Sequence, residues 1–145
     1  MRRARIADMR IVLGVEAGRE LVKLIESARR RVVAVTPFVS EVGLELLCRA
    51  SSRGARVVLV TTPETAHSLR ARAVECGIEL LAIEGLHAKV YSVDGRVLTG
   101  SLNLTSGGLR SNIEILIDFG DSEEGRELEK AVEKLIELYA HRLSE

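Results

Sequence analysis

The sequence has little of several residue types, and each shortage excludes a class of protein. Tryptophan is absent and aromatic residues are 3% of the 145 residues, so a platform for stacking single-stranded nucleic acid is poorly supplied. Two cysteines, Cys48 and Cys76, are too few for a disulfide-rich scaffold or a four-cysteine zinc site. We expect two buried thiols in a reducing compartment. No apolar run approaches the roughly 18 residues of a membrane span, and charged residues interrupt any signal-peptide core. These shortages predict a soluble cytoplasmic protein.

Amide side chains are also scarce. Glutamine is absent, and asparagine occurs only at positions 103 and 112, beside abundant glutamate and arginine. This balance favours a thermophilic source. The formal net charge is +0, but the N-terminal part carries more Lys and Arg than acids, and the last helix-like stretch shows the reverse. A basic N-terminal segment, about residues 1–14, includes Arg2, Arg3, Arg5 and Arg10 as candidate contacts for a polyanion.

Hydrophobic periodicity predicts one α/β domain over residues 1–145. Strands are predicted at 9–15, 31–36, 56–61, 78–83, 89–93, 96–100 and 114–119. Helices are predicted at 17–31, at 41–52 after the cap Ser40, from Thr65 or Ser68 to Cys76, and from Asp121 or Ser122 to the C-terminus. The arginines at 29–31 would then close the first helix. Helices between strands imply parallel pairing, and Asp94-Gly95 signals a hairpin. We expect a mixed, largely parallel sheet with helices on both faces.

Polar side chains gather near the ends of the predicted strands, where solubility does not require them. They are His87, Lys89, Ser101, Asn103 and Glu114. Each alone has an ordinary explanation, such as a surface histidine, an edge-strand lysine or side chains that bond the loop backbone. A hairpin at Asp94-Gly95 returns the end of its second strand beside the start of the first, so His87, Lys89, Ser101 and Asn103 can converge at one end of the sheet. Residues two apart on a strand also share a face.

The gathered groups suit a phosphate. An imidazole can attack phosphorus while an ammonium and neutral donors hold the phosphate oxygens. No cluster of carboxylates or of His and Cys accompanies them, so we expect no metal and no cofactor. Metal-free phosphoryl transfer is the chemistry that these residues favour.

These residues also carry a family resemblance. His87-Ala88-Lys89, then Asp94, then Gly100-Ser101-Leu102-Asn103 resembles the H-x-K-x4-D…G-S-x-N signature of the phospholipase D superfamily. Glu114 falls where that family places an acid. The resemblance implies a phospholipase D-like α-β-α sandwich and a small, single-motif, nuclease-like member.

The resemblance implies a role for each matching residue. His87 would be the nucleophile, forming a phosphohistidine, and would serve as general acid and base. Lys89 and Asn103 would bind phosphate oxygens with Ser101 assisting. Glu114 would fix the tautomer of a histidine. We interpret Asp94, at the hairpin turn, and Gly100 as structural members of the motif.

The family's reaction needs two histidines, and this chain holds one signature. His67 and His141 lack a lysine two residues further on. We therefore expect a homodimer with one shared site. We favour nucleic acid, DNA or RNA, as the substrate and an endonuclease-like activity of low sequence specificity. Low specificity is expected because so small a domain has little surface for reading bases. The alternatives are a lipid or small-molecule phosphodiesterase and a non-catalytic module that binds nucleic acid or a partner.

Overall fold

The computed structural model describes residues 9–143. Most of the predicted basic N-terminal segment, including Arg2, Arg3 and Arg5, therefore lies outside the described residues. Arg10 is described, and it pairs with Glu20 at 3.4 Å and with the buried Asp118 at 3.6 Å.

Strands and helices alternate through the first half of the chain and then give way to hairpin-connected strands. The strands are β1 (Arg10–Gly14), β2 (Arg31–Val35), β3 (Arg56–Thr61), β4 (Glu79–Ala82), β5 (Val90–Val93), β6 (Arg96–Gly100), β7 (Glu114–Asp118) and β8 (His141–Arg142). The helices are α1 (Glu16–Glu26), α2 (Glu41–Ser52), α3 (Pro63–Cys76) and α4 (Glu123–Tyr139), with a short π-helix, η2 (Gly107–Ser111).

Local signals explain where several elements begin and end. The Thr62 hydroxyl accepts a hydrogen bond from the Thr65 backbone N–H, so α3 starts at Pro63, earlier than the predicted Thr65 or Ser68. Gly77 ends α3 in the left-handed conformation, at φ 74°. Ser122 caps α4 through the Gly125 N–H. Ser40 occupies the cap position of α2 as predicted, but its side chain makes no capping bond.

The strands form a sheet in the order β1-β7-β6-β5-β2-β3-β4-β8. The predicted mixed α/β class is confirmed, but the expectation of a largely parallel sheet is wrong. Among the described pairings, only β2–β3 and β3–β4 are parallel. Helical crossovers connect those strands, whereas a tight turn joins β5 to β6 and a loop returns the chain to β7, which forces antiparallel pairing. β8, a two-residue strand, had no periodic signal to predict it.

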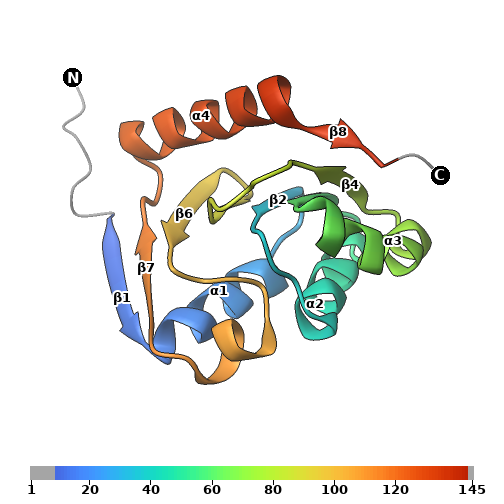
Figure 1. Ribbon diagram of the computed structural model, residues 1–145. Coiled ribbons are helices and arrows are strands. Elements are labelled where there is room, and N and C mark those ends of the chain that lie inside the picture. The colour runs from blue at the N-terminus through green and yellow to red at the C-terminus, as the bar shows by residue number, and fades with distance from the viewer. Residues whose placement is uncertain (1–8, 144–145) are drawn as a thin grey trace.

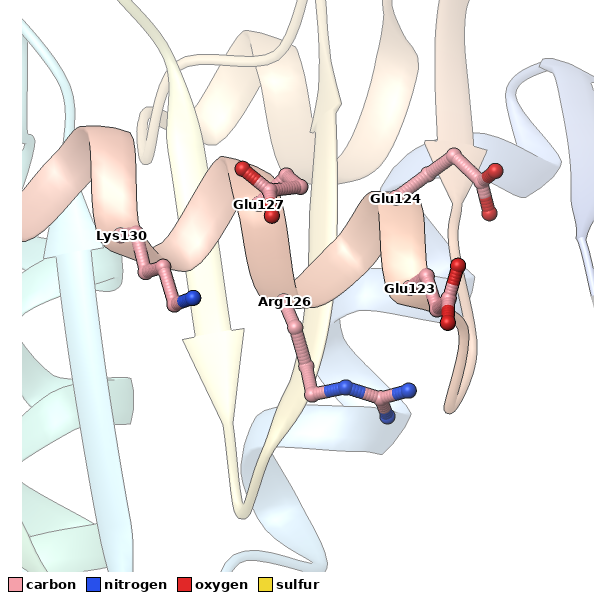
Figure 2. A pocket seen from close by; sticks show the side chains of 5 residues that line it. All are labelled: Glu123, Glu124, Arg126, Glu127 and Lys130. Atoms are coloured by element: carbon pink, nitrogen blue, oxygen red, sulfur yellow. The ribbon is translucent and has the colours of Figure 1, made fainter.

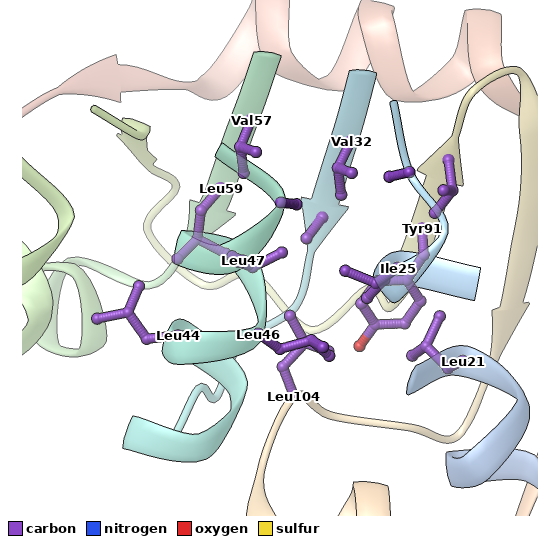
Figure 3. Packing of buried hydrophobic residues seen from close by; sticks show 14 of the residues in the cluster. Leu21, Ile25, Val32, Leu44, Leu46, Leu47, Val57, Leu59, Tyr91 and Leu104 are labelled. Atoms are coloured by element: carbon purple, nitrogen blue, oxygen red, sulfur yellow. The ribbon is translucent and has the colours of Figure 1, made fainter. Parts of the chain in front are cut away.

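Helices cover both faces of the sheet, as predicted (Figure 1). On one face α1, α2 and α3 enclose the larger core, whose members include Leu21, Ile25, Leu47, Leu59 and Tyr91 (Figure 3). On the other face Val132 of α4 packs into a smaller core with Val35 and Val60. Leu128, Leu135 and Ile136 join it, whereas Tyr139, predicted on the same face, is 62% exposed.

The first helix is shorter than predicted, and the arginines after it have another role. α1 ends at Glu26, so Arg29, Arg30 and Arg31 do not lie at its C-terminus. Their backbone N–H groups instead donate to the Asp94 carboxylate at 3.0, 2.9 and 2.8 Å. Residues 29–31 thus form a turn built around a carboxylate from the β5–β6 hairpin.

The prediction of two buried thiols is wrong. The sulfur atoms of Cys48 in α2 and Cys76 at the end of α3 are bonded, with their Cα atoms 5.3 Å apart. The Ser51 hydroxyl donates to the Cys76 carbonyl at 2.7 Å, at the same junction of the two helices. Disulfides are typical of oxidising compartments and of the interior of hyperthermophiles, so the expectation of a reducing compartment loses its basis.

The helices of the described chain are too short or too polar to cross a membrane, judged over residues 9–143.

Candidate functional site

The predicted site residues lie at one edge of the sheet, which is formed by the ends of neighbouring strands and not by an outermost strand. β2 and β6 end at this edge, whereas β5 and β7, which run antiparallel to them, begin there. The residues before β5, after β6 and at the start of β7 therefore lie together. Figure 1 shows the chain leaving β6 and returning through a short helical segment to the start of β7. The topology brings the five polar candidates to this edge, namely His87, Lys89, Ser101, Asn103 and Glu114.

His87 and Lys89 lie in the segment that leads into β5. Lys89 was predicted as the first residue of this strand, which begins one residue later, at Val90. His87 is exposed and Lys89 is half-buried. The Lys89 ammonium donates to the His87 carbonyl at 3.3 Å, and the Thr99 hydroxyl of β6 donates to the Lys89 carbonyl at 2.6 Å. The cation is thereby held close to the backbone that carries the imidazole.

Asn103 is half-buried, and its amide is oriented by a residue outside the predicted set. Thr36, fully buried at the end of β2, donates from Oγ1 to Asn103 Oδ1 at 3.0 Å. With its oxygen engaged, Asn103 presents Nδ2 as the donor. The signal that could have found Thr36 is a hydroxyl at the end of an otherwise apolar strand, directly before a proline.

Ser101 and Glu114 contact each other across β6 and β7. The Ser101 hydroxyl donates to Glu114 Oε1 at 2.5 Å and accepts from the Ile115 N–H at 3.0 Å. Asn112 Nδ2 donates to Glu114 Oε2 at 3.1 Å. Within residues 9–143 the carboxylate makes no hydrogen bond to His87 of its own chain. The Ser101 proton is thus engaged by Glu114, and its predicted contact with phosphate stays a prediction.

Gly100 and the buried Tyr91 fix the loop after β6. A Cβ at Gly100 would collide with the carbonyl oxygen of Ile115, so glycine lets β6 and β7 approach closely at the site. The Tyr91 hydroxyl donates to the Leu102 carbonyl at 2.6 Å, between Ser101 and Asn103. Burial raises the pKa of Tyr91, which keeps this hydroxyl protonated as a donor. Nothing in the sequence marks Tyr91 as part of the site, because a tyrosine inside an apolar strand is typical of core packing.

Asp94 lies at the opposite edge of the sheet, at the β5–β6 turn, with φ 50°. Burial acts to raise the pKa of its carboxyl, but the hydrogen bonds from the backbone of Arg31, Arg29 and Arg30 lower it overall. Its distance from His87 along the hairpin and its backbone partners fit a structural role.

An open groove elsewhere on the surface has a different character. It lies on the first turns of α4 and is lined by Glu123, Glu124, Arg126, Glu127 and Lys130 (Figure 2). β7 begins at the candidate site, and the chain continues from the other end of β7 into α4. The groove therefore lies at the edge of the sheet opposite the candidate site. No group of three or more His, Cys, Asp or Glu in residues 9–143 is arranged to hold a metal ion.

The α/β sandwich gathers an imidazole, an ammonium and a fixed carboxamide at one sheet edge. This combination is typical of proteins that bind and act on phosphate groups. Comparison with known proteins identifies the family. Residues 21–136 match the family described as "Cardiolipin synthase, PLD-like domain". The chain belongs to this phospholipase D-like family, a branch of a superfamily of phosphodiesterases.

Relatives and solved structures agree with this assignment. Cardiolipin synthase A of Erwinia tasmaniensis is 29% identical over 130 residues, which are 80% of this chain and 26% of that protein. The chain thus spans about a quarter of the length of the curated relatives it matches. NucT from Helicobacter pylori superposes with a TM-score of 0.79 at 18% identity, over 93% of this chain and 98% of that one. Nuc from Salmonella typhimurium, a phospholipase D family member, gives 0.71 at 20% identity, over 94% and 98%. At these identities the two structures establish the fold.

Proposed function

We propose that this protein is a metal-independent phosphodiesterase, and most specifically a nuclease of low sequence specificity. The observation that carries the proposal is the convergence of His87, Lys89 and the Thr36-oriented Asn103 at one sheet edge. Full-length superposition on NucT and Nuc adds support for a small nuclease-like protein.

The chemistry proceeds in two displacements. A ring nitrogen of His87 attacks phosphorus, forming a P–N bond as the P–O bond to the leaving group breaks. A second imidazole gives its proton to the departing oxygen. Water then attacks the phosphohistidine and passes a proton back to that second imidazole, and the P–N bond breaks. Lys89 and Asn103 Nδ2 stabilise the charge on the non-bridging oxygens in both steps.

The second imidazole is His87 of a second copy in this proposal, because the chain contains one signature. Glu114 does not bond its own His87, which leaves its carboxylate available to orient the histidine of the other copy. The two copies would then contribute equivalent groups to one site.

An apolar strip beside the site fits this second copy. Leu13 of β1 pairs in register with Ile115 of β7, and these side chains are 67% and 41% exposed. Ile113, directly before Glu114, is 87% exposed, and Ile11 is 64% exposed. Contiguous exposed apolar side chains mark interaction surfaces, and this strip is continuous with the residues that need a partner.

The decisive assay measures cleavage of plasmid DNA, single-stranded DNA, RNA and phospholipid vesicles in excess EDTA over a range of temperatures. We expect nucleic acid cleavage that survives EDTA and is lost in His87→Asn and Lys89→Ala. His67→Asn is the matched control, because His67 is an exposed histidine on α3 outside the signature. Phospholipid cleavage alone would replace the nuclease by a lipid phosphodiesterase, which the cardiolipin synthase relatives favour. Loss of activity with EDTA would contradict the mechanism.

The shared site has its own test. Titration of His87→Asn into the wild type, with subunit exchange, should lower activity as the square of the wild-type fraction. A linear decline would show that each chain acts alone. Leu13→Glu should yield a monomer by light scattering, whereas Val74→Glu, at a 64% exposed position on α3, should stay dimeric.

A further inference from the structure

Phe38 is an exposed aromatic side chain at the edge that carries the candidate site. It is 56% exposed and belongs to neither hydrophobic core. The other aromatic residues of the chain lie elsewhere. Tyr91 is buried, Phe119 follows β7 at the opposite edge, and Tyr139 ends α4. A chain with few aromatic residues thus exposes one of them at the edge that carries its candidate site.

The backbone that carries Phe38 is firmly anchored. Three hydroxyls, from Thr61, Thr62 and Thr65, lie within hydrogen-bond distance of the single carbonyl of Pro37, at 3.2, 3.3 and 3.0 Å. The Thr36 hydroxyl also approaches the Phe38 carbonyl at 3.3 Å. The contacts to the Pro37 carbonyl hold the backbone directly before Phe38 in place, although the Phe38 ring contributes little to the core.

The same segment is paired with the loop that carries Asn103. Val39 forms a parallel bridge with Leu104, and the Ser40 N–H donates to the Leu104 carbonyl at 2.9 Å. The Thr36 hydroxyl oxygen lies 3.3 Å from the Phe38 carbonyl oxygen and 3.0 Å from Asn103 Oδ1, so Phe38 and Asn103 both adjoin the same buried hydroxyl. The exposed Phe38 side chain therefore extends from backbone that adjoins a group proposed to bind the scissile phosphate.

We propose that Phe38 is a stacking subsite for the base of the nucleotide next to the scissile phosphate. This inference rests on the proposed nuclease function and specifies its substrate as single-stranded or locally unpaired nucleic acid. A base inside a duplex is already stacked on its neighbours, whereas an unpaired base can lie on the ring. Stacking on an aromatic ring accepts every base, which agrees with low sequence specificity.

The test compares Phe38→Ala with the wild type on two single-stranded oligonucleotides. One is normal, and the other carries abasic sites at the positions flanking a single cleavable phosphodiester. Stacking is worth about 1–3 kcal/mol per base, so Phe38→Ala should raise KM about 5- to 150-fold on the normal oligonucleotide. It should change KM little on the abasic one. Phe38→Tyr is the conservative control and should keep the wild-type KM on both.

Each outcome distinguishes the stacking proposal from the nuclease proposal. An equal loss on both oligonucleotides would overturn stacking and leave Phe38 a structural residue, and an unchanged KM on both would also overturn it. Neither result touches the nuclease activity, which the wild type shows in the same assay. If the wild type cleaves neither oligonucleotide, the proposed function fails and the subsite fails with it. Because Phe38 lies outside both cores, thermal unfolding of Phe38→Ala should match that of the wild type.

Discussion

Reduction of the Cys48–Cys76 disulfide breaks one covalent bond and removes no atom from the side chains that pack around it. The bond joins α2 to α3 and closes a loop with a sequence separation of 28. Oxidised and reduced forms of the same protein can therefore be compared without the cavity that a cysteine substitution would create.

The expected magnitude follows from the loop length. Closing a loop of this size in the unfolded chain removes entropy equivalent to about 3.6 kcal/mol at 25 °C. Unfolding of globular proteins gains about 2.1 cal/mol/K per residue near 60 °C, which for this chain is about 300 cal/mol/K. The reduced protein should therefore unfold about 12 °C below the oxidised one.

Thermal and urea unfolding, followed by far-ultraviolet circular dichroism with and without a phosphine reductant, measure this difference. Thiol titration under denaturing conditions must show no free thiol before reduction and complete reduction after it. The Cys48→Ala/Cys76→Ala double variant is the control, because its unfolding midpoint should not respond to the reductant. A decrease below about 2 °C in fully reduced protein would refute the loop-entropy reasoning. Two free thiols in protein prepared under oxidising conditions would refute the pairing itself.

Three further substitutions test the contacts around the site and the hairpin. Asp94→Asn should lose about 1 kcal/mol of stability at pH 7, because the amide keeps one acceptor oxygen and loses the charge. Since the pKa of Asp94 is lowered in the folded state, its contribution is complete above the unfolded value of about 3.9 and is lost as the pH falls, so wild type and variant should converge in acid denaturation. Thr36→Val should lower kcat about tenfold by releasing the Asn103 amide, and Thr36→Ser should restore it. An unchanged kcat in Thr36→Val would show that Thr36 serves only to pack β2. Gly100→Ala should lower the free energy of unfolding by about 1–3 kcal/mol, measured in urea, through collision with the Ile115 carbonyl, and an unchanged midpoint would contradict that close approach.

Much of the fold could be predicted from sequence because its signals are local. The apolar, β-branched run of β3 was placed at 56–61, and the turn residues Asp94-Gly95 positioned the hairpin of β5 and β6. The edge strand β1 was also expected, from a short apolar run. These predictions are confirmed because each depends on residues that are adjacent in the chain.

Features that depend on distant contacts could not be predicted. The end of α1 was misplaced because arginines at 29–31 suit a helix C-terminus, whereas their backbone instead meets a carboxylate more than sixty residues away. The disulfide was missed because its formation depends on how α2 lies against α3. The sheet was expected to be more parallel than it is, since the return of the chain to β7 and the pairing of β8 depend on tertiary packing.

The candidate site was predicted as a set of residues, but its internal bonds were not. Hairpin geometry predicted that His87, Lys89, Ser101 and Asn103 converge, and the topology brings them to one edge. That Thr36 holds the Asn103 amide is a side-chain contact between loops that follow different strands, and periodicity carries no information about it.

The position of Asp94 bears on how the family signature should be used. His87 and Lys89 stand at one end of β5, and Asp94 stands at the other, where it fastens the hairpin to residues 29–31. One short motif therefore contains residues of two kinds: those proposed to carry out the chemistry, and an aspartate that stabilises the fold. A relative that had lost its nucleophile could keep the aspartate and still fold in this way. Searches for active members of the family should therefore score the residues at the site edge apart from the aspartate.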